Sequence, residues 1–162
     1  MDLGTASVDE LMTLARASEE ADAYWAAVTE LHRRGGERAF KLAGVLCDSI
    51  LAGERCLGAD VLGRLDGFAE ESRPVVRDLL NEEEQPAVLA AAAASAGFLH
   101  DEEAADRLVA LASHPEEGVR FAVLSALMRL DVDRGVATLT ELSIDGGDGV
   151  REWAAETLDR LH

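Results

Sequence analysis

Lysine is nearly absent from this 162-residue sequence, in which Lys41 is the single example. Arginine supplies the remaining positive charge, and the formal net charge is −17. Nucleic-acid backbones and anionic membranes are bound by neutralising them with Lys and Arg. The charge balance therefore disfavours nucleic acid and membranes as partners. It favours solubility, and it suits a protein or peptide partner that carries basic segments.

Cysteine and long apolar runs are equally scarce. Cys47 and Cys56 both have apolar neighbours, which indicates buried free thiols rather than a disulfide framework. No apolar run is long enough to cross a bilayer. The chain also starts with acidic residues where a signal peptide would be basic. We therefore expect a cytoplasmic protein.

Aromatic residues make up only 4% of the sequence, although 48% of it is hydrophobic. The core must therefore consist mainly of Ala, Leu and Val. A β-sandwich would use more β-branched and aromatic residues, and no stretch shows the alternation of a strand. The composition predicts an all-α fold of closely packed helices.

One pattern recurs along the chain. Residues 118–130 (GVRFAVLSALMRL) and 149–161 (GVREWAAETLDRL) are similar and lie roughly 30 residues apart, and weaker copies begin near Ala23, Glu54 and Val88. A fixed period of this size indicates stacked helical repeats. We predict an α-solenoid of about five antiparallel helix pairs. It forms a single domain over 1–162, with repeats at approximately 7–35, 36–66, 67–100, 101–131 and 132–162.

Capping signals place several helix starts. Ser7 and Glu10 have the spacing of a capping box. Ser18 and Asp101 are each followed by two acids, which predicts two further N-caps. Pro74 is predicted in the first turn of its helix, where proline is tolerated.

The recurring segments resemble HEAT repeats over roughly 19–162. They share a Val-Arg start, an Ala-rich middle and a Leu-x-x-Leu end, and they are most similar to the short bacterial type also found in phycobilisome lyase proteins. The full Val-Arg pair occurs at Val119-Arg120 and Val150-Arg151, and Arg55 retains half of it. The resemblance implies a superhelix (HEAT/armadillo-like) whose second helices line a concave surface that binds a protein or peptide.

The same resemblance implies two alternative functions. One is a small-molecule or chromophore-handling protein of the bilin-lyase type, with Cys56 and His32 as its polar groups. The other is a HEAT-like DNA repair protein, which the net charge of −17 disfavours.

Aligning the copies selects positions on the second helices that should face a partner. The candidates are Trp25, Val28, His32, Phe121, Leu124, Met128, Glu152 and Asp159. The middle copies carry small residues there, such as Gly63 and Gly97. Two interpretations remain open: an apolar trough that accepts a helix or peptide, or small residues that only let neighbouring helices approach. Trp153 lies one position away and is expected to cover the open end of the stack.

Sites for chemistry are not apparent. The four histidines share no ligand spacing with one another or with the cysteines. The acidic pairs fall in turns or first helical turns, and the acidic, glycine-rich run 145–149 lacks most ligands of a calcium loop and is predicted to be a turn. We expect no enzymatic activity, metal or cofactor, and both monomer and homodimer remain open.

Overall fold

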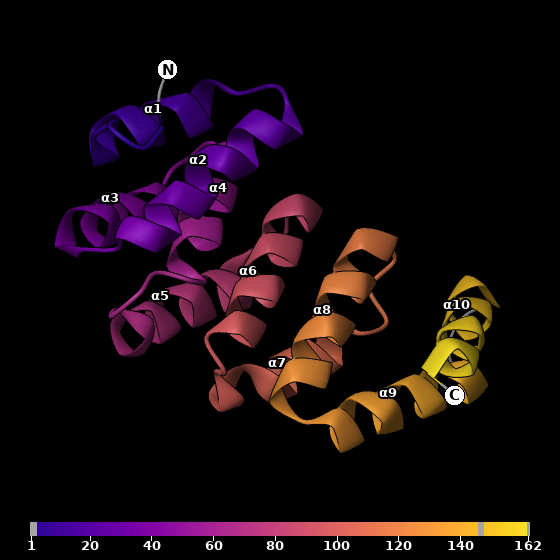
Figure 1. The fold of residues 1–162 in the computed structure, drawn as a ribbon. Helices are drawn as coiled ribbons and strands as arrows, with labels where there is room; N and C mark the ends of the chain where they lie inside the picture. The colour runs from indigo at the N-terminus through magenta and orange to yellow at the C-terminus, as the bar shows by residue number, and fades with distance from the viewer. Residues whose placement is uncertain (1–2, 146–147, 162) are drawn as a thin grey trace.

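The computed structural model describes residues 3–145 and 148–161 of the chain. Over these ranges it contains ten α-helices, one short 3-10 helix and no strand (Figure 1). The first helices of the five pairs are α1 (Val8–Ala17), α3 (Glu37–Cys47), α5 (Ala69–Glu82), α7 (Ala105–Leu111, preceded by the 3-10 helix Glu102–Ala104) and α9 (Val132–Asp145). The second helices are α2 (Ala21–Arg34), α4 (Ala52–Leu62), α6 (Pro86–Phe98), α8 (Glu117–Leu130) and α10 (Asp148–Leu161). The predicted all-α solenoid is confirmed. The predicted turn 145–149 includes residues outside the described ranges.

Among the predicted helix starts, Ser7 is confirmed, Ser18 and Pro74 are wrong, and Asp101 is right in position but not as a side-chain cap. At Ser7, the side chain accepts from the Glu10 amide at 3.2 Å, and the Glu10 carboxylate accepts from the Ser7 amide at 2.6 Å. Ser18 instead follows the end of α1 and donates its hydroxyl to the Leu14 carbonyl at 2.7 Å. Pro74 lies inside α5, which begins earlier, at Ala69. Asp101 is the N-cap residue of the 3-10 helix that leads into α7, but its side chain makes no capping hydrogen bond, because the buried carboxylate is bound by Arg77.

Helix α6 is the centre of the stack. It packs against α4 on one side and α8 on the other, and it also contacts its own first helix, α5. Glycines make the close approaches possible: a Cβ on Gly63 would lie 2.5 Å from Ser95 Oγ, and one on Gly97 would lie 2.6 Å from Ala126 Cα. The small residues in the middle copies therefore serve helix packing.

The last helix pair is attached differently from the others. Leu124 of α8, Leu139 of α9 and Ala154 of α10 form a small core that is separate from the main one. Helix α10 packs mainly on α9, and Figure 1 shows it standing apart from α8. The solenoid therefore has a continuous body from α1 to α8 and a less tightly joined C-terminal pair.

Arginine side chains hold consecutive repeats and turns together. Arg77 donates from Nε and Nη2 to the Asp101 carboxylate, both at 2.9 Å. In the Val-Arg motif, Arg120 Nη1 donates to the carbonyls of His114 at 2.9 Å and Pro115 at 2.7 Å, in the turn that precedes its own helix. Arg55 repeats this arrangement with the Ser49 carbonyl at 2.9 Å. The forked guanidinium group can bind two acceptors at once better than an ammonium group can. This accounts for the preference for arginine.

Candidate functional site

The second-helix face, defined here as the exposed surface of α2, α4, α6, α8 and α10, does not form one continuous trough. Its middle is closed where α4, α6 and α8 approach through Gly63 and Gly97. The exposed aromatic residues lie toward its two ends: Trp25 of α2 is 48% exposed and Phe121 of α8 is 66% exposed. The interpretation that the small residues serve packing is therefore correct for the middle of this face.

Two of the predicted contact residues belong to the core. Val28 is completely buried in the main core, and Leu124 is buried against Leu139 and Ala154. Met128 is half-buried against the same C-terminal cluster. The helical register was right, but α2 and α8 turn these positions toward neighbouring helices. Val28 and Leu124 are therefore inaccessible to a partner.

A pocket of about 560 Å³ opens where α1, α2 and α4 meet, and we call it the N-terminal pocket. Its lining combines apolar, aromatic and acidic side chains: Ala15, Arg16, Ser18, Tyr24, Leu51, Gly53, Glu54, Cys56, Leu57 and Asp60. Arg16 and Glu54 form an ion pair in this wall. The ring of Trp25 meets that of Tyr24 edge to face, with centroids 5.2 Å apart. The exposed aromatic at this end of the face is thus next to a cavity.

Asp60 is the main polar group of the N-terminal pocket. Tyr24 donates its hydroxyl to Asp60 Oδ2 at 2.6 Å, and His32 Nε2 lies 2.8 Å from the Asp60 carbonyl oxygen. Burial raises the pKa of the Asp60 carboxyl to about 6, although the Tyr24 hydrogen bond opposes this shift. Burial lowers the pKa of His32. The charge of Arg64 also opposes the pKa shift of Asp60, but burial outweighs both effects, so a cationic group placed beside Asp60 would favour its ionised form.

Cys56 lines the same pocket, but as a thiol. Burial, followed by the nearby Asp60 carboxylate, raises its pKa to about 11. The thiolate is the nucleophilic form of cysteine, so this residue is a poor nucleophile at neutral pH. The structure does bring Cys56 and His32 to the same region around Asp60, as the chromophore-handling alternative requires.

Sequence reasoning missed Tyr24 and Asp60. They are 36 residues apart in the chain and meet only because α2 lies beside α4. One signal was present: Asp60 lies in the last turn of α4 between Ala59 and Val61, which are both buried. A carboxylate in that position is costly without partners, and this cost marks the position as a candidate site.

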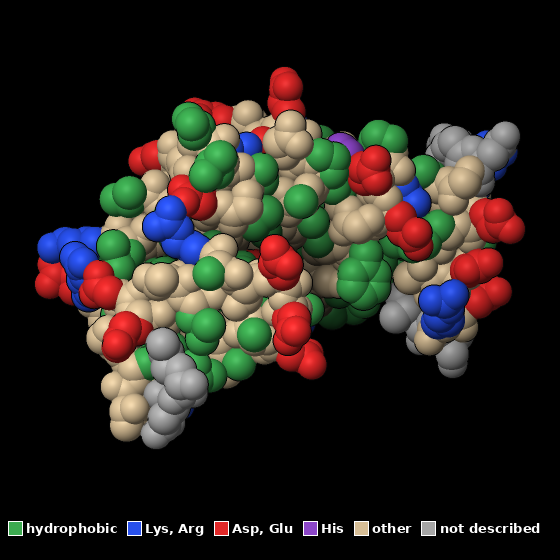
Figure 2. Space-filling model, turned by 90° about the horizontal axis from the view of Figure 1, so that it is seen from above, with side chains coloured by type: hydrophobic (Ala, Val, Ile, Leu, Met, Phe, Trp, Pro, Cys, Tyr) green, Lys and Arg blue, Asp and Glu red, His purple; other side chains and the backbone are tan. Residues whose placement is uncertain are grey.

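The C-terminal end of the face has a different character. Phe121 projects from α8, while Trp153 of α10 packs on the small core, with the Arg120 guanidinium carbon 5.3 Å from its ring centroid. Trp153 therefore faces the stack and does not cover its outer end. Glu152 and Asp159 are exposed on α10. Figure 2 shows the surface hollowed between the body and the C-terminal pair, with hydrophobic side chains beside the hollow and acidic ones on the pair.

Among residues 3–145 and 148–161, no three His, Cys, Asp or Glu side chains are grouped so that they could hold a metal ion. Within the same ranges, no helix is both long and apolar enough to span a bilayer.

Comparisons with known proteins agree with this architecture. The family model described as HEAT repeats matches residues 73–159. Among solved structures, the X-ray structure of YibA from Escherichia coli resembles the chain with a TM-score of 0.78 and 20% sequence identity. The similarity covers 97% of this chain but only 59% of that one, and at this identity it establishes the fold alone. No curated protein matches the chain.

Proposed function

Because the chain belongs to the HEAT-repeat family, we propose that it is a non-enzymatic scaffold that binds a protein or peptide on its second-helix face. HEAT repeats generally mediate protein interactions. The observation that carries the proposal is the N-terminal pocket, in which an apolar wall meets the partly buried carboxyl of Asp60, with the exposed Trp25 next to it through its ring contact with Tyr24. Aromatic anchors beside such a pocket are typical of binding hot spots.

The partner segment carries a basic side chain that enters the N-terminal pocket. Close to the pocket in the chain, Glu19 and Glu20 lie between α1 and α2 and Asp22 lies in the first turn of α2, and none of these three is in an ion pair with another described residue. A lysine or arginine placed next to Asp60 stabilises the ionised carboxylate. Binding should therefore strengthen as the pH rises from 5 to 7 and Asp60 loses its proton.

Affinity capture with variants tests this assignment. Partners retained by the wild type are compared with those retained by Trp25→Ala, Phe121→Ala and the double variant. Ile144→Ala, which removes a 67% exposed side chain from a first helix, is the matched control. We expect Trp25→Ala and the double variant to lose the partners and Ile144→Ala to keep them. Equal recovery by all variants would show that the second-helix face is not the binding surface.

The two alternatives have less support from the geometry. Chromophore attachment would use a nucleophilic Cys56, whose raised pKa keeps it protonated. DNA repair would use a basic groove, whereas most of the described arginines are bound to carboxylates or to backbone carbonyls. A single domain over 1–162, divided into the five predicted repeats, remains part of the proposal.

A further inference from the structure

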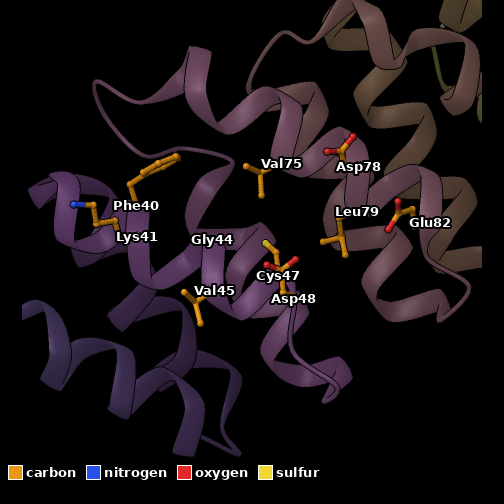
Figure 3. Close-up of a pocket in the computed structure, with 10 residues that line it drawn as sticks. All are labelled: Phe40, Lys41, Gly44, Val45, Cys47, Asp48, Val75, Asp78, Leu79 and Glu82. Carbon is orange, nitrogen blue, oxygen red and sulfur yellow. The ribbon is translucent and has the colours of Figure 1, made fainter.

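A second hollow lies on the surface formed by the first helices, between α3 and α5. Figure 3 shows its lining, which includes Phe40, Gly44, Val45, Val75 and Leu79, and its volume is about 440 Å³. An adjoining hollow of about 370 Å³ shares part of this lining: Cys47, Asp48, Leu79 and Glu82. The two hollows form one continuous depression, the α3–α5 groove. The groove and the N-terminal pocket share no lining residue, so the two sites are separate.

The groove combines an apolar floor with unpaired carboxylates. Val45 is 70% exposed, and Phe40 stacks on Phe68 with ring centroids 5.2 Å apart. Asp48, Asp78 and Glu82 also line the groove, and none of the three forms an ion pair within the described part of the chain. The one lysine, Lys41, lines the groove as well but is bound to Glu37 at 2.6 Å. The charge left for a partner to neutralise is therefore negative.

Gly44 leaves the α3 backbone uncovered along this groove. Gly58 and Gly135, which also lie inside helices, are explained by packing, since a Cβ there would lie 2.7 or 2.6 Å from a neighbouring atom. A Cβ on Gly44 would meet nothing within 4 Å. Glycine weakens a helix interior, and no contact among the described residues requires it here. Its lack of a side chain leaves the α3 backbone open to a group from outside.

We propose that the α3–α5 groove binds an amphipathic, basic α-helix of a partner protein, packed with its apolar side against Gly44, Val45 and Val75. Lys or Arg side chains along the edge of that helix then lie over Asp48, Asp78 and Glu82. Helix-in-groove recognition uses apolar anchors at helical spacing, and a small residue allows close backbone approach. The eleven residues of α3 span about 16 Å, which matches a partner helix of about three turns.

The test uses a synthetic, fluorescein-labelled peptide of about 14 residues, in which Leu and Lys segregate to two faces of a helix. Its affinity is measured by fluorescence anisotropy at low salt. Two control peptides are a shuffled sequence of the same composition, which is not amphipathic, and a version with Glu in place of Lys. We expect only the amphipathic basic peptide to bind. Failure of the wild-type protein to bind it would overturn the proposal.

Protein variants locate the binding. Gly44→Leu fills the groove with a good helix former, and we expect it to weaken binding by about tenfold or more. Asp78→Asn with Glu82→Gln should weaken it about fivefold. The matched controls are Gly118→Leu, at another glycine with nothing within 4 Å of its Cβ, and Asp133→Asn with Glu141→Gln, which makes the same change in charge on α9. Both should bind within about twofold of the wild type.

Two further readouts assign the binding to this groove. Gly44→Ala should raise Tm by about 2 °C while weakening binding, so that a loss of affinity cannot be attributed to misfolding. Trp25→Ala should leave the affinity unchanged, because it alters the other face. Wild-type affinity in Gly44→Leu, or loss of affinity in Trp25→Ala, would contradict the proposed site.

Discussion

Asp60 shows how one residue can link stability to function in this molecule. Its carboxyl is held inside the N-terminal pocket by the Tyr24 hydroxyl at 2.6 Å, and burial raises its pKa to about 6 from an ordinary 3.8. An acid whose pKa is raised by folding binds its proton more tightly in the folded state. It favours folding fully below about pH 4, and this contribution is lost as the pH rises through about 6. The site therefore costs stability at neutral pH, as binding sites commonly do.

Asp60→Asn tests this cost. The amide keeps an acceptor for Tyr24 but never ionises. We expect the variant to match the wild type in thermal melts near pH 4 and to exceed it at pH 7.5 by about 2–3 kcal/mol. Asp133→Asn, an exposed substitution on α9, is the control and should differ from the wild type by less than about 0.5 kcal/mol at both pH values. A constant difference between Asp60→Asn and the wild type across this range would contradict the account.

Arg120 shows what the arginine of the Val-Arg pair does in the fourth repeat. The side chain is only 8% exposed, and it donates to two carbonyls of the preceding turn while lying near the Trp153 ring. Arg120→Ala should lower the free energy of unfolding by about 2–3 kcal/mol. Arg160→Ala, which removes an exposed arginine paired within α10, should cost less than about 0.5 kcal/mol. Urea unfolding of both variants measures the two losses. Equal losses would contradict the stabilising role given to Arg120.

At the scale of elements, the sequence predicts the type of structure better than the positions of its surfaces. The repeat period predicted five helix pairs, and the Ser7 capping box predicted the start of α1. The starts placed at Ser18 and Pro74 were wrong, and Asp101 precedes a 3-10 helix without capping it through its side chain. Caps and first turns depend on tertiary partners, as Arg77 shows by binding Asp101.

The candidate site was predicted only in part, for a related reason. Helical register correctly predicted that Trp25 and Phe121 are exposed. It could not show that Val28 and Leu124 meet neighbouring helices, because the packing of α2 on α4 and of α8 on α9 is a tertiary property. The N-terminal pocket could not be located from the sequence for the same reason, since Tyr24 and Asp60 come from different repeats.

Close packing around α6 makes a prediction for its glycine. Gly97→Ala would place a methyl group 2.6 Å from the Ala126 Cα of α8, where backbone must move to accommodate it. We expect a loss of about 1–3 kcal/mol, measured by urea unfolding. Gly44→Ala is the matched helix-interior control, and it should instead gain about 0.5–1 kcal/mol. A gain in the free energy of unfolding of Gly97→Ala would contradict the described packing.

At the scale of the whole molecule, the solenoid should not unfold as one unit. The α9–α10 pair is joined to the body through a small core of Leu124, Leu139 and Ala154, whereas α1 to α8 share the main core. In repeat proteins, stability depends on such neighbour interfaces. We expect amide hydrogens of α9 and α10 to exchange at least about tenfold faster than those of α6 and α8. Uniform protection across all four helices, measured by hydrogen exchange with mass spectrometry, would contradict this division.

The charge of the whole molecule has one consequence for binding. With a net charge of −17, and with most of its described cations engaged in internal contacts, the protein presents free acid on both faces. Association with a basic partner should therefore slow as salt is added.

The central claim is that a basic partner segment occupies the N-terminal pocket beside Trp25. Trp153→Phe leaves Trp25 as the single tryptophan, and its emission can be followed while a partner recovered by affinity capture is added. The account predicts a blue shift of Trp25 emission that saturates with binding, strengthens from pH 5 to pH 7 and is lost in Asp60→Asn. Binding that leaves Trp25 emission unchanged would place the partner elsewhere and contradict the claim.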